Sequence, residues 1–251
     1  MKNKIEFLGF YGSDETVALS AWTSTSRDLT DEKRKRIPNL IDQLWNNHHE
    51  TPFEKVIVHF LVDAEIASHI HLLKHRISSI NGESARYKEL KEDKYYIPED
   101  WTSMDVLNPF EYTGYPEGAF FEGKITGNEL WSDVLYDYTK LGNFLYHKCL
   151  EDLTPRLGRK RAKESARFFK TYNSQIQVDI MFNMRSFANF IKLRNSEHAQ
   201  LEIREIAQEM WNILQKETNG QLNNILKVID ERIKFEEKCE KYKDIILKMP
   251  D

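Results

Sequence analysis

The stretch KHRISSINGESARY at 74–87 concentrates side chains that can bind an anion. Cations are favoured in the last turn of a helix, which accounts for its first three residues. The polar residues that follow need another reason, and Gly82 would let the backbone approach a ligand there. A phosphate site and a well-capped helix end are therefore equally consistent with the stretch. The residues of this stretch that could bind the anion are Lys74, His75, Arg76, Asn81, Ser84 and Arg86.

A second stretch, NMRSFANFIKLRNSEHAQ at 183–200, places polar residues among the apolar residues of a predicted helix. A solvated polar face is the ordinary explanation. Two Asn and two Arg with few Glu or Lys, however, make an unusual solvent face. Amide and guanidinium groups suit paired hydrogen bonds to carboxylates, phosphates and base edges. We therefore expect a ligand near Asn183, Arg185, Asn189 and Arg194.

Two weaker motifs suggest a metal and a phosphate loop. His71 and His75 are four residues apart on a predicted helix, but the acid of an H-E-x-x-H site and a third ligand are missing, so we expect no metal. The segment GAFFEGK at 118–124 resembles a P-loop. Ile125 follows its lysine, however, where a hydroxyl would be needed to bind magnesium.

The basic run RLGRKRAKESAR at 156–167 could contact nucleic acid, or it could be a solvated helix face. The net charge of −4 favours the solvated face, so we expect no nucleic-acid partner. Arg167 differs from the rest of the run because Phe168 and Phe169 follow it. We expect Arg167 to be held for a ligand or an ion pair.

Cys149 and Cys239 lie in charged, helical contexts and form no C-x-x-C motif, which is typical of a reduced cytoplasmic protein without an activated thiol. The N-terminus begins basic, but Glu6 and Asp14 interrupt any apolar region, so we expect no signal peptide. The strongly apolar run at 56–62 is too short to span a bilayer, and no membrane association is expected.

The elements that position these residues follow from periodicity and capping. Alternating, β-rich segments predict strands, whereas apolar residues at spacings of three and four predict helices. The predicted strands cover 4–12, 53–64 and 171–182. The predicted helices cover 14–22, 30–47, 64–76, 128–152, 158–169, 183–194 and 198–217, with a charged terminal helix at about 220–248. A loop is expected at 77–87, and residues 91–125 are expected to be irregular, with no function assigned.

The composition suits a folded, soluble chain of 251 residues, with 40% hydrophobic and 30% charged residues. We find no internal repeat and no linker that would divide the chain. The sequence therefore predicts a helix-rich α+β fold with an antiparallel sheet, as a single domain over 1–251.

Three stretches together resemble the flavin-dependent thymidylate synthases. HRISSINGESARY resembles the family signature of Arg-His-Arg and, seven residues later, Ser, here with Lys74 first and Ser84 last. HETPFE at 49–54 resembles the upstream segment, and NMRSFANFIKLRNSEHAQLEI at 183–203 resembles the C-terminal signature. They occur in the family's order and at about its spacing, so the resemblance covers at least residues 45–210.

The resemblance implies an enzyme that converts dUMP into dTMP. Methylenetetrahydrofolate would supply the carbon, and FAD, reduced by NADPH or NADH, would supply the hydride. The resemblance also implies an α+β fold and a homotetramer whose active sites are built from several subunits. The order of hydride and carbon transfer is not implied. Neither cysteine matches the activated nucleophile of the classical thymidylate synthases.

Carried over by position, one set of residues would hold the flavin: Thr51, Lys74, His75, Arg76, Asn183, Arg185 and Asn189. A second set would hold the nucleotide: His71, Lys74, Glu83, Ser84, Arg86, Arg167 and Arg194. Arg194 matches the arginine that polarises the uracil ring. A fixed guanidinium there would stabilise negative charge on the ring, so Arg194 is the expected catalytic residue.

Three departures from the family pattern lie on the nucleotide side. His71 replaces the usual glutamine, Lys74 replaces an arginine, and Gly82 precedes Glu83 where the acid usually comes first. A relative that acts on another pyrimidine nucleotide, or transfers a different one-carbon unit such as hydroxymethyl, is therefore an alternative. A non-catalytic nucleotide- or nucleic-acid-binding protein is a more distant one.

Overall fold

The computed structural model describes residues 2–113 and 122–246. The chain forms two compact units, which we name the sheet unit (4–63, 68–82 and 177–251) and the helix-pair unit (1–3, 64–67 and 83–176). Strands β2 (Ile57–Glu65) and β6 (Gln175–Asn183) each begin in one unit and end in the other. The single domain over 1–251 stays a prediction.

The sheet unit is built on a four-stranded sheet with the order β1-β2-β6-β3. Strand β1 (Lys4–Tyr11) pairs antiparallel with β2, and β3 (Ser79–Gly82) pairs antiparallel with β6. The alternating residues of β2 and β6 put Val58, Phe60, Ile180 and Phe182 on a buried face, as the period of two requires. The antiparallel sheet and the helix-rich α+β class were predicted and are confirmed.

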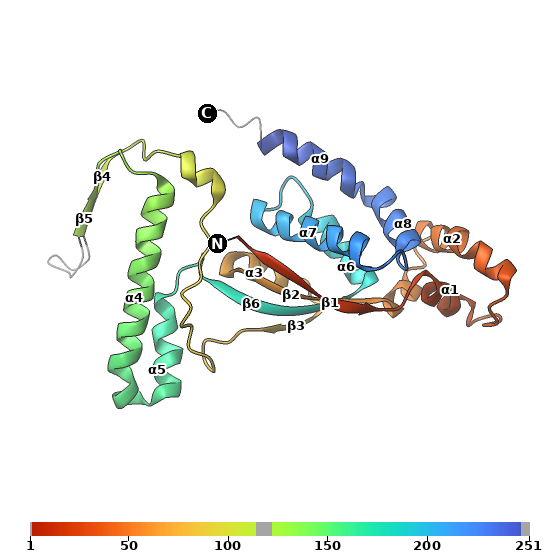
Figure 1. The fold of residues 1–251 in the computed structure, drawn as a ribbon, viewed down its shortest axis with the longest axis horizontal. Helices are drawn as coiled ribbons and strands as arrows, with labels where there is room; N and C mark the ends of the chain where they lie inside the picture. The colour runs from red at the N-terminus through yellow and green to blue at the C-terminus, as the bar shows by residue number, and fades with distance from the viewer. Residues whose placement is uncertain (1, 114–121, 247–251) are drawn as a thin grey trace. The chain divides into compact units, whose positions relative to one another are not determined.

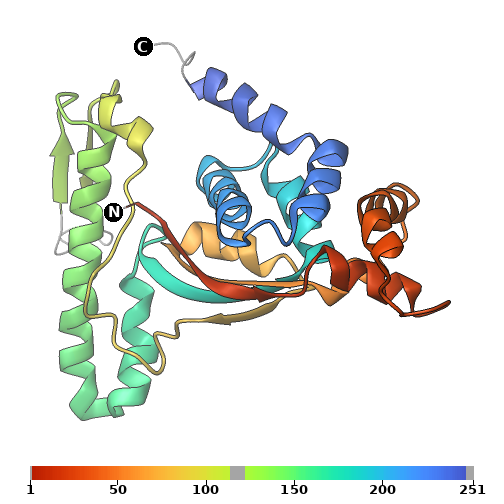
Figure 2. The ribbon, with the colours of Figure 1, turned by 45° about the vertical axis from the view of Figure 1, so that its right-hand side comes forward.

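Helices α6 (Met184–Arg194) and α7 (Leu201–Glu217) lie on one side of this sheet (Figures 1 and 2). Phe187 and Phe190 of α6 are fully buried and contact the ring of Phe182. Burying an aromatic side chain of this size contributes about 2–3 kcal/mol. This packing fixes which face of α6 is left for a ligand.

Helices α1 (Asp14–Trp22) and α2 (Asp31–Asn46) of the sheet unit begin where capping residues predict. Ser13 caps α1 in a capping box with Thr16, and Thr30 caps α2. The 3-10 turn η1 (Thr51–Lys55) precedes β2, and α3 (Ile66–Leu73) follows it. Helices α8 (Asn223–Ile233) and α9 (Phe235–Ile246) end the described chain.

The helix-pair unit is organised around α4 (Trp131–Leu157) and α5 (Arg159–Ala166), which pack against each other. The short turns η2 (Glu99–Ser103) and η3 (Arg167–Phe169) belong to this unit, as do the paired strands β4 (Phe110–Thr113) and β5 (Glu122–Ile125). A buried Lys170 ammonium bridges Asp93 at 2.6 Å and Asn143 at 2.7 Å. The irregular segment that follows residue 91 is therefore tied to α4.

Three sequence expectations about the fold need correction. Residues 91–125 were expected to be irregular, but Phe110–Thr113 and Glu122–Ile125 pair as β4 and β5. Residues 79–82 were expected in a loop, but they form β3, because their backbone pairs with Val178–Met181 of β6. The charged terminal helix expected at about 220–248 is two helices, separated at Lys234 in the left-handed conformation (φ 54°). The break lets Phe235 pack on Trp211, with ring centroids 4.7 Å apart. Residues 118–121 of the P-loop-like segment and 247–248 of that helix lie outside the described residues.

Candidate functional site

A cavity of about 620 Å³ in the sheet unit collects residues from three separate stretches of the sequence. Helix α6 and the segment after α3 form most of its lining, and η1 with the residue before it adds two acidic side chains. The lining residues are Glu50, Glu54, Lys74, His75, Arg76, Ile77, Arg185, Ser186, Asn189, Leu193 and Arg194. The structure thus brings most of the predicted flavin positions together.

Helix α6 presents one face to this cavity because its other face is buried in the core. Arg185, Asn189 and Leu193 are spaced by four residues, so they follow one another along the exposed side. Asn183 caps the helix, and its side-chain oxygen accepts from the backbone N–H of Ser186 at 2.8 Å. The amide nitrogen of Asn183 is the group left for a ligand, since the oxygen is used locally.

The guanidinium of Arg194 is held by two histidines and a carbonyl. Its Nε donates to Nε2 of His75 at 2.9 Å, and Nη1 faces Nδ1 of His71 at 3.3 Å. Nη2 donates to the backbone oxygen of His71 at 3.2 Å. Because arginine carries two N–H groups on each terminal nitrogen, one on each is left for a ligand. The two facing imidazole nitrogens already accept from a cation, so their lone pairs are engaged rather than free for a metal.

His75 is buried, with 8% of its surface exposed, beneath this guanidinium. Burial, the charge of Arg194 and the neighbouring His71 lower the pKa of His75 to about 4. The ring is therefore neutral at neutral pH, and Nε2 can accept from Arg194. Its edge packs against Phe190, with ring centroids 4.9 Å apart. Burial also lowers the pKa of Arg194 from its ordinary value.

Arg185 is tethered by two carboxylates. Its Nη1 donates to Glu54 at 2.7 Å and its Nε to Glu50 at 3.2 Å. Glu50 also accepts from Arg232 at 2.8 Å. Burial alone would raise the pKa of Glu50, but the bond from Arg232 and the charges of Arg232 and Arg185 lower it overall. Thr51, beside Glu50, is exposed on η1. The segment HETPFE thus supplies the acids that orient a predicted flavin-binding arginine.

The other predicted nucleotide positions lie in the helix-pair unit. Arg86 donates from Nε to Glu164 of α5 at 2.9 Å, and its backbone N–H donates to the Ser84 hydroxyl at 3.3 Å. Arg167 comes three residues after Glu164 and is exposed, so it lies about one helical turn along the same side. Exposed ion pairs contribute little to stability, so Arg86 can exchange Glu164 for an anionic ligand. Glu83 binds Lys88 at 2.6 Å.

Gly82, which departs from the family pattern, lies against the side chain of His69. A Cβ at this position would lie 2.8 Å from Cε1 and 3.2 Å from Nε2 of His69. The His69 imidazole therefore occupies the space that a side chain at 82 would need, and an acid there requires His69 to move. Nε2 of His69 is buried without a hydrogen-bond partner among the described residues, and burial lowers the pKa of this histidine.

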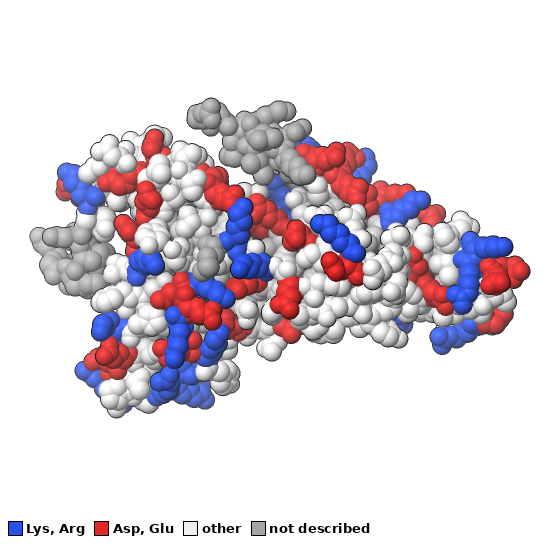
Figure 3. Space-filling model, in the orientation of Figure 1, with Lys and Arg blue, Asp and Glu red and all other residues white. Residues whose placement is uncertain are grey.

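Part of the basic run at 156–167 is paired with nearby acids. Arg156 pairs with Asp152 at 3.2 Å and Arg159 with Glu89 at 2.8 Å. On the face drawn in Figure 3, acidic side chains adjoin the basic ones over the helix-pair unit. The absence of a nucleic-acid partner stays a prediction. Among the described residues, no helix has the length and apolar character needed to cross a membrane.

The two cysteines are partly buried rather than on the charged helical surfaces that the sequence suggested. Cys149 packs beside a core cluster that includes Tyr146 and Leu150. The sulfur of Cys239 accepts from the Asn195 side-chain nitrogen at 3.3 Å. Neither lines the cavity of the sheet unit.

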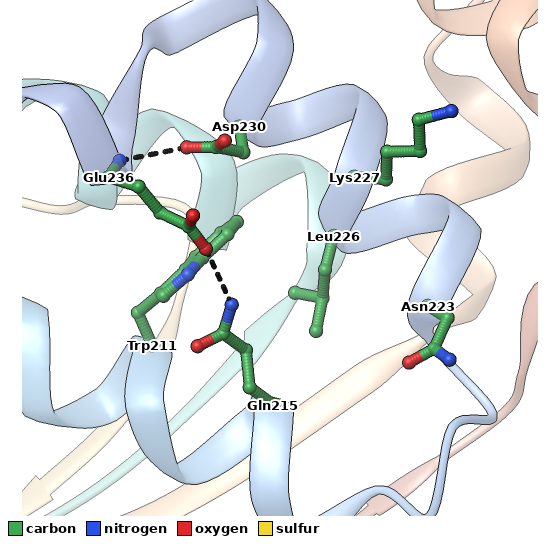
Figure 4. A pocket seen from close by; sticks show the side chains of 7 residues that line it. All are labelled: Trp211, Gln215, Asn223, Leu226, Lys227, Asp230 and Glu236. Atoms are coloured by element: carbon green, nitrogen blue, oxygen red, sulfur yellow. Dashed lines mark hydrogen bonds between the residues drawn. The ribbon is translucent and has the colours of Figure 1, made fainter.

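A second cavity of about 350 Å³ lies between α7, α8 and α9 and contains no predicted site residue (Figure 4). Its two carboxylates serve the fold. Asp230 accepts from the backbone N–H of Glu236 at 2.9 Å, and Glu236 accepts from Gln215 at 2.8 Å. Trp211 lies beside them with only 1% of its surface exposed. These bonds account for the polar lining as part of the junction between α8 and α9.

The family model described as "Thymidylate synthase complementing protein" matches residues 7–218. A flavin-dependent thymidylate synthase of Pseudothermotoga lettingae is 31% identical over 205 residues, which are 81% of this chain and 80% of the relative. The chain belongs to the flavin-dependent thymidylate synthase family. It is therefore a flavin-dependent methyltransferase, and the resemblance inferred from three motifs is confirmed.

Other relatives agree with this family membership. The flavin-dependent thymidylate synthase of Thermosipho melanesiensis is 31% identical over 227 residues, which are 90% of this chain and 91% of the relative. A crystal structure of the UMP/dUMP methylase PolB from Streptomyces cacaoi, bound with 5-Br dUMP, matches the fold with a TM-score of 0.67. That match has 24% identity and covers 92% of this chain and 95% of PolB.

The sequence reasoning missed several cavity residues. Glu50 and Glu54 lie in HETPFE, a motif whose acids were given no role. Their negative charge was the signal that they could bind an arginine such as Arg185. Ile77 and Leu193 were given no role by the sequence, but they are 72% and 50% exposed beside the cavity. Gln200 lies in the C-terminal signature and contacts His71.

Proposed function

We propose that this family member catalyses the reductive methylation of dUMP to dTMP, with methylenetetrahydrofolate as the carbon donor and NADPH as the reductant of its FAD. The observation that carries the proposal is the held guanidinium of Arg194. It lies at the edge of a cation-rich cavity, and two of its terminal N–H groups are left for a ligand.

The cavity has the charge that a flavin nucleotide needs. Four cationic side chains, Lys74, Arg76, Arg185 and Arg194, line it together with the carboxylates of Glu50 and Glu54, which leaves a net charge of 4 − 2 = +2. A pyrophosphate with about two negative charges would be complementary to this balance. The exposed side chains of Ile77 and Leu193 would cover an apolar ring. The residues present therefore fit FAD.

The predicted flavin positions divide by chemistry. Lys74, Arg76 and Arg185 would meet the phosphates, and the amides of Asn183 and Asn189 would meet polar ring or ribose groups. His75 would support the site from beneath as a neutral acceptor, and Thr51 would lie at its margin on η1. The flavin, reduced by the nicotinamide cofactor, would supply the hydride when bound.

Arg194 would act on the pyrimidine. Its remaining N–H groups would donate to the uracil ring and stabilise the negative charge that develops as C5 becomes nucleophilic. A single fixed donor in a water-poor site contributes about 3 kcal/mol to such a transition state. Because its other donors are already bound to His71 and His75, the guanidinium would need little reorganisation.

Ser84, Arg86 and Arg167 would bind the phosphate of the nucleotide. The pairing of Arg86 with Glu164 keeps this guanidinium oriented until a phosphate, with its higher charge, replaces the carboxylate. Lys74 and Glu83 complete this proposed nucleotide set, whereas His71, which the sequence also assigned to the nucleotide, contacts Arg194 and Gln200. A homotetramer with shared active sites, acting in the cytoplasm, is part of this proposal.

A second candidate is a broader or shifted choice of nucleotide. His71, Lys74 and Gly82 all depart from the family pattern on the nucleotide side, and the His69 ring fills the space beside Gly82. A second structure of PolB, bound with 5-Br UMP, is 25% identical, and the match covers 90% of this chain and 93% of PolB with a TM-score of 0.67. A ribonucleotide or another pyrimidine nucleotide is therefore the alternative substrate, as is transfer of a hydroxymethyl group.

The visible spectrum of the purified protein tests the flavin and the nucleotide together. We expect a yellow protein whose flavin absorbance changes when dUMP is added. A colourless protein that takes up no added FAD would refute the proposal. Parallel titrations with UMP and dCMP would identify a shifted preference.

Arg194→Ala tests the proposed catalytic role. We expect FAD binding to persist while methyl transfer falls by about 10²-fold or more, because the lost interaction acts mainly in the transition state. Lys192→Ala is the matched control, since Lys192 is exposed on the same last turn of α6. Near-normal turnover in Arg194→Ala would show that this arginine is only structural.

A further inference from the structure

The ring of His71 has both of its nitrogens engaged. Nδ1 faces Nη1 of Arg194 at 3.3 Å, and Nε2 faces the side-chain oxygen of Gln200 at 3.2 Å. A guanidinium only donates and an amide oxygen only accepts. The neutral ring must therefore carry its proton on Nε2 and offer the lone pair of Nδ1 to Arg194.

Gln200 is itself oriented by a buried acid. Its side-chain nitrogen donates to Glu202 at 2.7 Å, and Glu202 is 8% exposed. Since the amide nitrogen is bound to a carboxylate, the amide oxygen is turned toward His71. The bonds form a continuous relay from Glu202 through Gln200 and His71 to Arg194. All four residues belong to the sheet unit.

We infer that His71 is a positioning residue for Arg194, held in its accepting form by Gln200 and Glu202, and that its protonation sets an acid limit on turnover. This inference rests on the proposed function. It assigns His71 a different role from the direct contact with the nucleotide that its sequence position suggests, because neither ring nitrogen is left for a ligand.

Protonation of His71 would convert the Nδ1 acceptor into a donor that faces a guanidinium. The hydrogen bond between Arg194 and Nδ1 of His71 would be lost, and two cations would face each other at hydrogen-bonding distance. The groups around the ring are Arg194 on α6, the neutral His75 after α3, and Gln200 with Glu202 at the start of α7. Among these groups Glu202 carries a compensating charge, and it reaches the ring through the uncharged amide of Gln200.

Two substitutions should change the fall in kcat at acid pH. His71→Gln supplies a carbonyl acceptor that does not titrate, so the part of this fall that is caused by protonation of His71 should disappear. Gln200→Glu places a carboxylate on Nε2, which favours the protonated ring, so this fall in kcat should move to higher pH. Gln208→Glu is the matched control, because Gln208 also lies on α7 but bonds to Asn195 instead.

The assay is kcat and KM for dUMP in the FAD-loaded enzyme between pH 5.5 and 8.5. We expect the two variants to change the pH profile of kcat while KM for dUMP and FAD affinity change by less than about threefold, the split expected when orientation rather than binding is lost. Profiles that coincide with wild type in both variants would overturn the inference and leave the proposed function intact.

Proton NMR of the histidine rings gives a reading that needs no turnover. The His71 resonance is identified by its loss in His71→Gln, and its titration should move to higher pH in Gln200→Glu but not in Gln208→Glu. An unchanged His71 titration would refute the relay even if the wild-type enzyme acted on none of the nucleotides tested. A shifted titration in an enzyme without methyl transfer would support the relay and refute the proposed function.

Discussion

His75 should make the stability of the protein depend on pH. Its ring is buried under Arg194, and its pKa is lowered to about 4, against about 6.5 in an unfolded chain. Between these two values the unfolded chain binds the proton and the folded chain does not. The free energy of unfolding must therefore fall as the pH falls from about 6.5 to about 4, and this contribution becomes constant below that range.

The magnitude follows from the two pKa values. At pH 7 both states are mostly neutral. At pH 5 the unfolded histidine is almost fully protonated and the folded one is not, which costs about 2 kcal/mol of stability relative to pH 7. The full shift corresponds to about 3 kcal/mol, an upper limit because part of the ring's surroundings can relax.

The assay is urea unfolding at pH 7 and pH 5 in wild type and His75→Gln, at one fixed FAD concentration. Glutamine keeps an acceptor for Nε of Arg194 but does not titrate, so the pH-dependent loss should shrink by about 2 kcal/mol in this variant. His198→Gln is the control, because that side chain is exposed and its loss should change nothing. Equal pH dependence in wild type and His75→Gln would refute the reasoning.

Three further predictions concern other positions. The double variant Cys149→Ala and Cys239→Ala should keep turnover within a few-fold of wild type, because neither sulfur lines the cavity; complete loss in a folded protein would indicate a thiol mechanism. Gly82→Ala should lower the free energy of unfolding by about 1–3 kcal/mol through its contact with His69, and His69→Ala should remove most of that extra cost in a double-mutant cycle; additive losses would contradict the steric explanation. Asn183→Asp should keep the α6 cap but weaken FAD binding, whereas Asn183→Ala should also cost about 1 kcal/mol of stability; unchanged FAD affinity in Asn183→Asp would remove Asn183 from the site.

Local chemistry in the sequence determined much of the fold. The apolar residues Phe187, Phe190 and Ile191 predicted α6 within 183–194, because a 3.6-residue period acts within one element. The alternation in 53–64 and 171–182 predicted β2 and β6 for the same reason. The order and spacing of three motifs were enough to indicate the family.

Pairings between distant residues were decided only by the tertiary structure. Strand β3 has four residues, and its hydrogen bonds come from β6 rather than from its own sequence. The break at Lys234 follows from the burial of Phe235 on Trp211, since nothing in the residue type of a lysine favours the left-handed conformation.

In the candidate site, too, the sequence determined the residue types and the tertiary structure decided their contacts. The sequence identified Arg194, His71 and His75 as residue types with the right chemistry. That Arg194 lies between the two imidazoles depends on α6 packing beside the end of α3, across separations of 119 and 123 residues. Local propensity carries no information about such a contact, because it is set by which apolar faces are buried together. The charge state of His75 and the relay through Gln200 follow from that packing.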